Sequence, residues 1–427
     1  MSLRSKFAIV VLSAAVAFYA VVGGWMSTRA QQQQNDPGSQ LIIFESVLQH
    51  IQRDYVDEPN LEKVRAGALR GLANGLDPYS TYLSAEQVKD YQSGGNKTAV
   101  GIGAELSQLA SYLYIVAPIK GGPADVAGIK AGDVIEYIDS KATRDISLYD
   151  ARQLLNGAAG TEVKLRILRQ RSKPLTIAVK RAAVKVPAAE GKMEAGKIGV
   201  LKVNSLAEGE VADVKARLTD LQKQGALKIV LDLRSVAGGM LAEGVGVANL
   251  FIKEGALAQT VGRESKSLKT FAADPKAFVF GGPTAVLVDN GTAGAAEVVA
   301  SAFLERKRGE VIGERSFGAG TEQQLFTLRN GDGLLLTVVK WASGDGKPFL
   351  GDERDKSGIE PSLKEKAAAA PETATDDGED DGELPGATQP APTVPPVKQP
   401  TEDLQLKKAL ELLRGNENKT VAKTIAN

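Results

Sequence analysis

The chain has 427 residues, and its 52 lysines and arginines are balanced by 52 aspartates and glutamates. Because this length exceeds what one hydrophobic core supports, we expect roughly two to four structural units, enough for an enzyme. The zero net charge removes the electrostatic reason to expect a nucleic-acid partner, and the absence of cysteine excludes a disulfide framework and a thiolate nucleophile.

No metal or cofactor is expected. Paired histidine ligands are impossible because His50 is the single histidine, and the acidic run at 376–381 lacks the spacing of a calcium-binding loop. A Ser-His-Asp hydrolase would have to use His50. Its place in an amphipathic helical pattern predicts a surface or packing residue instead.

The first 30 residues predict a signal anchor or a signal peptide. Arg4 and Lys6 precede an apolar run at 7–26, which matches the ~20 residues that cross a bilayer and exceeds the roughly 7–15 of a signal peptide. We favour an anchor in the inner membrane over cleavage after Ala30. The basic flank then places the body on the periplasmic side of the cell envelope. A buried core helix is the alternative.

Residues 41–94 predict a helical region, with apolar residues at helical spacing through Leu48, Ile51 and Tyr55. Pro78 ends one helix, and Ser84 is placed to cap the next, at 85–91. The region shows no chemistry by itself.

Residues 97–184 change to short β-rich runs separated by glycines, which predicts a compact β-sandwich or barrel with two helices. The strands are expected at 112–116, 134–138, 163–168 and 175–179, and the helices at 123–127 and 147–155.

Residues 192–364 alternate strand and helix, which predicts an α/β core with mostly parallel strands. The fold class is therefore a multidomain combination of α+β and α/β parts. The core strands are expected at 198–203, 228–233 and 284–288, and its helices at 208–224, 241–251 and 295–306.

The C-terminal part changes composition again. Residues 366–400 are rich in alanine, proline and acid, so they bury too little apolar surface to order and predict a disordered linker. Residues 403–415 then predict a short amphipathic helix that docks on the body, on a second copy, or only transiently.

Four groups of motifs follow one another in a recognisable order. They are Asp54-Tyr55-Val56-Asp57 with Leu76-Asp77-Pro78; Gly101-Ile102-Gly103 with Gly128-Ile129-Lys130-Ala131-Gly132-Asp133; Asp232-Leu233-Arg234 with Gly238-Gly239; and Gly313-Glu314-Arg315. On these motifs, residues 41–364 resemble the C-terminal processing peptidases, or tail-specific proteases, of family S41. The resemblance implies a PDZ domain over 97–184 and a Ser/Lys peptidase-like core over 192–364.

The first glycine motif is a candidate peptide-binding loop. In a PDZ fold, such a loop presents backbone N–H groups to the terminal carboxylate of a peptide, and the peptide adds a strand to the sheet edge. Gly101, Ile102 and Gly103 would form this loop. A tight turn is the alternative interpretation.

The second glycine motif is a candidate oxyanion hole. Gly238 and Gly239 are either a plain turn or a place where backbone N–H groups contact a substrate oxyanion. Their position after a strand of an α/β layer favours the second interpretation. The N–H of Ala295 is a further candidate.

The two residues that do the chemistry in the family are missing. The resemblance places the nucleophilic serine in the middle of a Ser/Thr-Ala-Ser-Ala-Ser-Glu stretch, where this chain has Gly294. It places the lysine base between two glycines, where this chain has Ala319, at the family's spacing of 25 positions. Gln323 matches the residue that orients the lysine. Because loss of one such group costs about a million-fold in turnover, hydrolysis by the family mechanism is not expected.

Other side chains are weaker candidates for a relocated dyad. Ser301 lies about two turns deeper in the same helix, Ser316 and Ser343 adjoin turns, and Lys340 ends an apolar run. Thr292 precedes the helix near the oxyanion candidates, but a role as helix cap explains it.

Three hypotheses remain open. The first is a catalytically inactive pseudoprotease that binds protein C-termini or unfolded polypeptides, as a scaffold or regulator that pairs with an active paralogue or with itself. The second is an active serine endopeptidase, with a relocated nucleophile or as an inactivated form of an active parent. The third is a PDZ adaptor in which the core is only a spacer.

Overall fold

The structure is a computed structural model that describes residues 13, 17–19, 37–94, 100–109, 111–144, 146–170, 172–367 and 402–425. The chain forms two compact units, residues 1–68 and residues 69–427. The expected membrane segment at 7–26 lies almost entirely outside the described residues, as does most of the expected linker at 366–400. None of the helices in the described part of the chain has both the length and the apolar character to span a bilayer.

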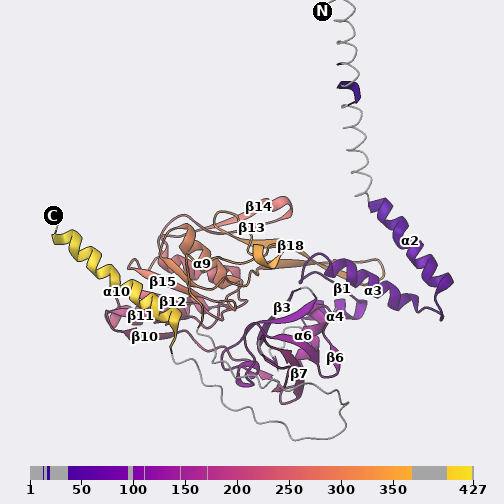
Figure 1. Cartoon of the computed structure of the whole chain (residues 1–427), viewed down its shortest axis with the longest axis horizontal. Coiled ribbons are helices and arrows are strands. Elements are labelled where there is room, and N and C mark those ends of the chain that lie inside the picture. The colour runs from indigo at the N-terminus through magenta and orange to yellow at the C-terminus, as the bar shows by residue number, and fades with distance from the viewer. Residues whose placement is uncertain are drawn as a thin grey trace, which may run out of the picture. The chain divides into compact units, whose positions relative to one another are not determined.

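The first unit contains helix α2 (Pro37–Asp54) and the start of helix α3 (Leu61–Asn74) (Figure 1). His50 lies on the exposed side of α2, where its Nδ1 is 2.7 Å from Asp54 Oδ2. It is therefore a surface residue, as predicted.

The predicted helix cap near the start of the second unit is confirmed. Helix α4 spans Ala85–Ser93, and the Ser84 hydroxyl accepts a hydrogen bond from the N–H of Gln87 at 3.3 Å. The Gln87 side-chain Oε1 in turn accepts from the N–H of Ser84 at 3.0 Å, which completes a capping box.

A short strand, which was not predicted, precedes helix α4. Residues Thr81–Leu83 form β1, which pairs antiparallel with β18 (Gly333–Ser343) in the register Thr81↔Leu335. These residues fall between the predicted helix end at Pro78 and the predicted helix at 85–91, and a partner some 250 positions away in the sequence decides their conformation.

The β domain, residues 100–183, has an antiparallel sheet of order β3-β4-β5-β7-β8, with β6 beside β5. The four predicted strands and both predicted helices are present, displaced at their ends by at most two residues. Val163, Leu165 and Ile167 alternate with exposed neighbours along β7 and are fully buried, as a half-buried strand requires. The elements are β2 (Val100–Gly101), β3 (Ala104–Leu109), β4 (Tyr112–Pro118), α5 (Pro123–Val126), β5 (Val134–Ile138), β6 (Lys141–Ala142), α6 (Leu148–Leu155), β7 (Glu162–Leu168), β8 (Leu175–Lys180) and β9 (Ala182–Ala183).

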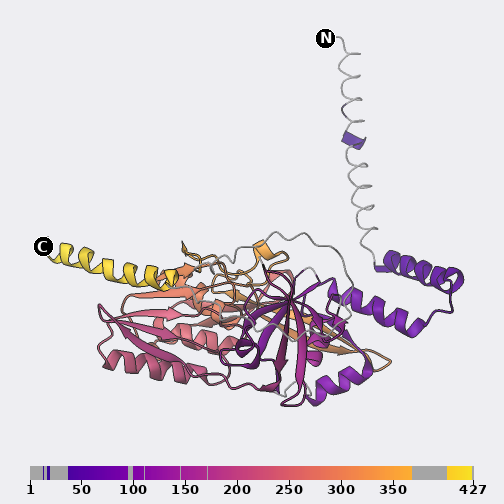
Figure 2. The ribbon, with the colours of Figure 1, turned by 60° about the horizontal axis from the view of Figure 1, so that its bottom comes forward.

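The core, residues 190–364, is built on a six-stranded sheet of order β10-β11-β12-β15-β16-β19, parallel except for the β10–β11 pair. Ile229 and Leu231 of β12 pack in the cluster that holds α7, α8 and α9, whereas Val230 packs against α10. Figure 2 shows the ribbon of the sheet with these helices on its two sides. With both faces covered, the inner strands β12 and β15 are buried throughout and consist mainly of apolar residues. The elements are β10 (Glu190–Glu194), β11 (Ile198–Lys202), α7 (Glu210–Lys223), β12 (Lys228–Asp232), α8 (Leu241–Phe251), β15 (Thr284–Val288), α9 (Ala295–Glu305), β16 (Glu310–Gly313) and β19 (Leu363–Lys364).

A second, antiparallel core sheet was not predicted. Its order is β1-β18-β13-β14, with β17 also paired to β18. Strands β14 and β17 are largely exposed and polar, so they lack the apolar runs that reveal the parallel sheet. Strand β18 does contain the apolar run that Lys340 ends, but the run alone does not show its partners. The remaining elements are β13 (Ala256–Val261), β14 (Ser267–Ala272) and β17 (Thr321–Thr327).

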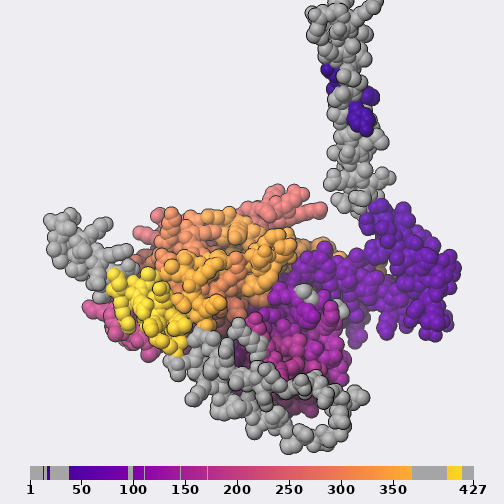
Figure 3. Space-filling model, viewed as in Figure 1, coloured from indigo at the N-terminus to yellow at the C-terminus, as the bar shows by residue number. Residues whose placement is uncertain are grey.

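Helix α10 (Leu404–Ile425) follows the core and is longer than the predicted helix 403–415. Of the three docking alternatives, the structure shows docking on the body. Ala409 and Leu413 are buried against the sheet face opposite α7–α9, and Figure 3 shows residues 402–415 on the surface of the core.

Candidate functional site

One cavity of about 160 Å³ brings most of the predicted site residues together. Gly238, Gly239, Gly294, Ala319 and Gln323 all line it. The other lining residues are Tyr79, Glu105, Leu106, Val116, Arg152, Ala293, Gly320, Thr321 and Trp341. Gly101, Ile102, Gly103 and Ala295 are not in this lining.

Gly294, at the nucleophile position, has a backbone conformation that suits glycine. Its φ of 63° and ψ of −116° place it outside the regions that L-residues occupy without strain. A Cβ at this position would lie 3.0 Å from Gly238 O. A serine would therefore require the Gly238 loop to move by a few tenths of an ångström.

The Gly-Gly loop packs directly on the turn that carries Gly294. The N–H of Ala293 donates to Val236 O at 2.9 Å, and the N–H of Ala295 donates to Gly238 O at 3.2 Å. The proposed oxyanion role of Ala295 does not fit this conformation, because its N–H is already engaged with the loop. Gly238 and Gly239 have φ of 76° and 83° and face the cavity, so their role as oxyanion donors stays a prediction.

Glu297 is a site residue that sequence reasoning missed. Its side chain is fully buried and links the turn of Gly294 to the turn of Ala319. Oε2 accepts from the N–H groups of Gly294 and Ala319, both at 2.8 Å. Oε1 accepts from the N–H of Gly318 at 2.7 Å and from the Ser316 hydroxyl. One carboxylate thus fixes the backbone at both dyad positions, Gly294 and Ala319. A lone charge in the otherwise apolar helix 295–303 was the available signal.

Burial dominates the titration of this carboxyl. Desolvation raises the pKa of Glu297 to about 7, although hydrogen bonds from Ala319, Ser316, Gly294 and Gly318 oppose the shift. Near neutral pH the group is therefore close to its midpoint.

The base position offers no proton acceptor. Ala319 lines the cavity with only a methyl group. Gln323, which orients the lysine in the family pattern, donates from Nε2 to Thr321 Oγ1 at 2.7 Å and to Thr337 Oγ1 at 3.4 Å. Its place in the cavity wall is kept, and its predicted role stays untested.

The other hydroxyls are engaged elsewhere. Thr292 is fully buried, and its Oγ1 donates to Leu233 O at 3.0 Å. It is not the helix cap that was predicted, because Gly294 occupies that position. Ser301 Oγ donates to Val298 O.

The remaining dyad candidates show no activating pair either. The Ser316 hydroxyl donates to Glu297, and Ser343 Oγ accepts from the N–H of Lys347 at 3.3 Å. Lys340 Nζ lies 3.9 Å from Asp352 Oδ1, so its pairing is with a surface carboxylate.

The predicted peptide-binding loop leads into the edge strand of the β domain. Gly101 ends β2, and Gly103, with φ of 68°, precedes β3, whose partner in the sheet is β4. The carbonyls of Ile102 and Gly103 accept from the N–H groups of Ala124 and Ile119 at 2.7 and 2.9 Å. The loop is thereby fixed by its carbonyls, beside a strand edge to which a peptide can add.

A salt bridge connects this edge to helix α6. Arg152 NH2 lies 2.9 Å from Glu105 Oε1, and both side chains also line the cavity of Gly294. A Cβ at Gly238 would lie 3.3 Å from Glu105 Oε2. The edge strand β3 and the dyad positions Gly294 and Ala319 therefore line the same cavity.

Comparison with known proteins gives consistent matches. The family model for peptidase family S41 matches residues 197–364, and a PDZ domain model matches residues 114–169. The carboxy-terminal processing protease CtpA of Bacillus subtilis is 32% identical over 361 residues, 84% of this chain and 76% of that protein. The carboxy-terminal-processing protease of Bartonella bacilliformis is 32% identical over 388 residues, 88% of each chain.

A solved structure extends the likeness to three dimensions. The photosystem II D1 C-terminal processing protease superposes with a TM-score of 0.62 at 27% sequence identity, covering 77% of this chain and 93% of that chain. Together with the order of domains and the shared cavity, these matches confirm the resemblance seen in the motifs. The chain belongs to peptidase family S41 and is a carboxy-terminal processing protease-like protein with a PDZ domain.

Proposed function

We propose that this protein binds protein C-termini or unfolded polypeptides through its PDZ groove and does not hydrolyse them. The observation that carries the proposal is a cavity lined by the family's glycine loop and orienting glutamine, in which the two positions of the family dyad are Gly294 and Ala319. The retained frame includes the Gly-Gly loop, the Glu297 hydrogen bonds and Gln323.

The chemistry supports inactivity. In a Ser/Lys dyad the buried lysine is held neutral, its pKa brought from about 10.4 toward about 7–8, so that it can take the serine proton. Gly294 supplies no side-chain hydroxyl to attack a peptide bond, and Ala319 supplies no side-chain amine to act as the base. The hydroxyl of Thr292 is fully buried and is engaged by Leu233 O at 3.0 Å and Asp289 Oδ1 at 3.1 Å.

The site also supports a binding role. The edge strand β3, the loop before it and the cavity of Gly294 are connected through Glu105. A bound polypeptide would pass from the PDZ groove to a core that does not cut it. The protein would then act as a scaffold or regulator, either alone, paired with a second copy, or paired with an active paralogue. Residues 7–26 would anchor it in the inner membrane, with the body on the periplasmic side.

Peptide binding is expected to depend on a free carboxylate and on the loop of Gly103. Fluorescence anisotropy with a labelled decapeptide library pool should show binding that falls by at least about ten-fold when the peptide termini are amidated. Gly103→Ala should weaken binding similarly, because its Cβ would meet Val184 at 2.9 Å and displace the loop.

Gly128→Ala is the matched control. Gly128 also has a positive φ, of 82°, but a Cβ there meets nothing within 4 Å, so it carries the same backbone strain away from the loop. Equal affinities for free and amidated peptides, or equal losses in both variants, would contradict the proposed groove.

A further inference from the structure

The sheet face opposite α7–α9 is an apolar surface that one helix covers. Its floor consists of buried side chains from four strands, and α10 contributes Ala409 and Leu413 at 0% and 2% exposure. The floor residues are Ile198, Val230, Ala285, Leu287 and Ile312. This face lies outside the cavity of Gly294, whose helix α9 packs on the other side of the sheet.

Polar contacts fasten α10 at both ends of β12. Lys228 Nζ, at the start of the strand, donates to Leu413 O at 2.9 Å. Beyond the end of the strand, Arg234 NH1 and NH2 donate to Asp403 Oδ1 and Oδ2, both at 2.8 Å. Asp403 also accepts from the N–H of Leu406 at 3.0 Å, so the residue that caps the helix also binds the core.

Arg234 is mostly buried, so its ion pair with Asp403 is partly shielded from solvent. Its side chain is 20% exposed and also pairs with Asp232 at 2.7 Å. Burial opposes its charge, but the hydrogen bonds that it donates to Asp232 and Asp403 outweigh burial and raise the pKa of Arg234. Burial likewise opposes the charge of Asp403, yet Arg234 holds its pKa below the usual range.

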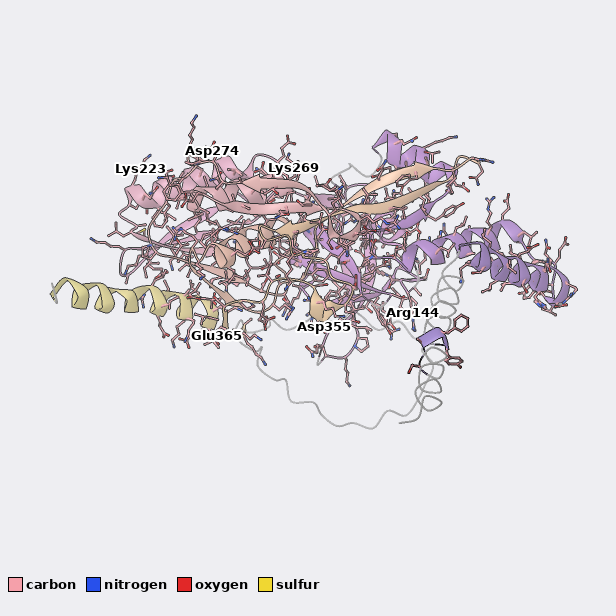
Figure 4. All side chains as sticks on the ribbon, turned by 90° about the horizontal axis from the view of Figure 1, so that it is seen from above. Arg144, Lys223, Lys269, Asp274, Asp355 and Glu365 are labelled. Atoms are coloured by element: carbon pink, nitrogen blue, oxygen red, sulfur yellow. The ribbon has the colours of Figure 1, made fainter. Side chains whose placement is uncertain are left out.

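The connection to α10 is longer than its path requires. Gln405 Nε2 donates to Glu365 O at 2.9 Å, and Glu365 lies beside the start of α10 (Figure 4). The described residues on either side of the segment 368–401 are therefore in direct contact. Thirty-four residues reach on the order of 110 Å when extended, so α10 can leave the sheet without unfolding it.

Arg234 also directly precedes the loop 235–239, which contacts the turn of Gly294. Lys202 Nζ donates to Asp232 Oδ1 at 3.3 Å and to Arg234 O, and the next residue, Ser235, donates from its N–H to Asp289 at 2.8 Å. The loop then reaches Gly238, whose carbonyl accepts from Ala295. A continuous series of contacts thus runs from Asp403 to the turn of Gly294.

We propose that residues 402–413 form a detachable latch that docks on this sheet face of its own chain and, through the Asp403–Arg234 contact, holds the loop 235–239 against the Gly294 turn. Release of the latch exposes the apolar face and loosens the loop. This inference concerns the conformation of the site and stands whether or not peptides bind the PDZ groove.

Hydrogen exchange of the full chain tests the coupling. Asp403→Asn keeps a helix cap but removes the charge that faces Arg234. Amide exchange should rise roughly ten-fold in both 404–413 and 235–239, while β15 stays protected. Glu402→Gln is the matched control, because it removes only the exposed contact with Lys407, and its exchange should equal that of the wild type.

A second variant separates coupling from simple loss of contact. Ala409→Glu puts a charge into the buried apolar cluster and should release α10 while leaving the charges of Asp403 and Arg234 in place. Loop 235–239 should lose protection, and an added peptide of residues 402–415 should restore it. Faster exchange in α10 with an unchanged loop would overturn the proposal. So would protection that grows with protein concentration, because the latch would then come from a second copy.

Discussion

Gly294→Ser combined with Ala319→Lys is expected to raise hydrolysis of an unfolded polypeptide by at least about a thousand-fold over the wild type. The physical reason is that both side chains would enter a cavity whose other walls are kept. Glu297 already holds the two turns together through the N–H groups of Gly294 and Ala319. The measurement is the rate of new N-termini released from a reduced, unfolded substrate.

The two single variants are the controls for this restoration. Gly294→Ser alone has a hydroxyl without a base, and Ala319→Lys alone has a base without a hydroxyl, so both should stay at the wild-type level. The serine must also accept a strained backbone and a Gly238 carbonyl at 3.0 Å from its Cβ, which costs about 1–3 kcal/mol. A folded double variant with no hydrolysis would show that the pocket is no longer shaped for catalysis.

Glu297→Ala is expected to lower the free energy of unfolding by about 4 kcal/mol at pH 5. The change leaves four buried donors without their acceptor and opens a void between two turns. Urea denaturation followed by circular dichroism measures the loss. Glu310→Ala is the control, because Glu310 is exposed and accepts from Ser362 Oγ alone, and should cost under about 1 kcal/mol.

The deficit of Glu297→Ala should shrink as pH rises. Burial raises the pKa of Glu297 from an ordinary 4.5 to about 7, so the folded protein binds more protons than the unfolded chain between these values. The free energy of unfolding of the wild type therefore falls by about 3 kcal/mol across this window, and the variant lacks this contribution. Parallel pH profiles for the two proteins would contradict the assignment.

The parallel sheet could be predicted from the sequence because each strand is buried on both faces. Lys228–Asp232 and Thr284–Val288 are short apolar runs between helical patterns, and the structure places them as neighbours. The strands β1 and β18 could not be found in the same way. Their pairing joins Thr81 to Leu335, and nothing in either local pattern specifies such a distant partner.

The candidate site divides along similar lines. Gly238, Gly239, Gly294, Ala319 and Gln323 were identified from their order and spacing, and they line one cavity. The engagement of the Ala295 N–H depends on how the loop packs on the Gly294 turn, which spacing does not encode. The docking of α10 was left open because an amphipathic pattern shows an apolar face but not what covers it.

The central claim is that a family S41 peptidase frame here holds polypeptides without cutting them. Mass spectrometry of an unfolded substrate after prolonged incubation with purified wild-type protein tests it most directly. We predict that the substrate is recovered intact, at the level of a protein-free control. Cleavage products that increase with protein concentration and persist in Thr292→Ala would contradict the account and point to a nucleophile elsewhere in the chain.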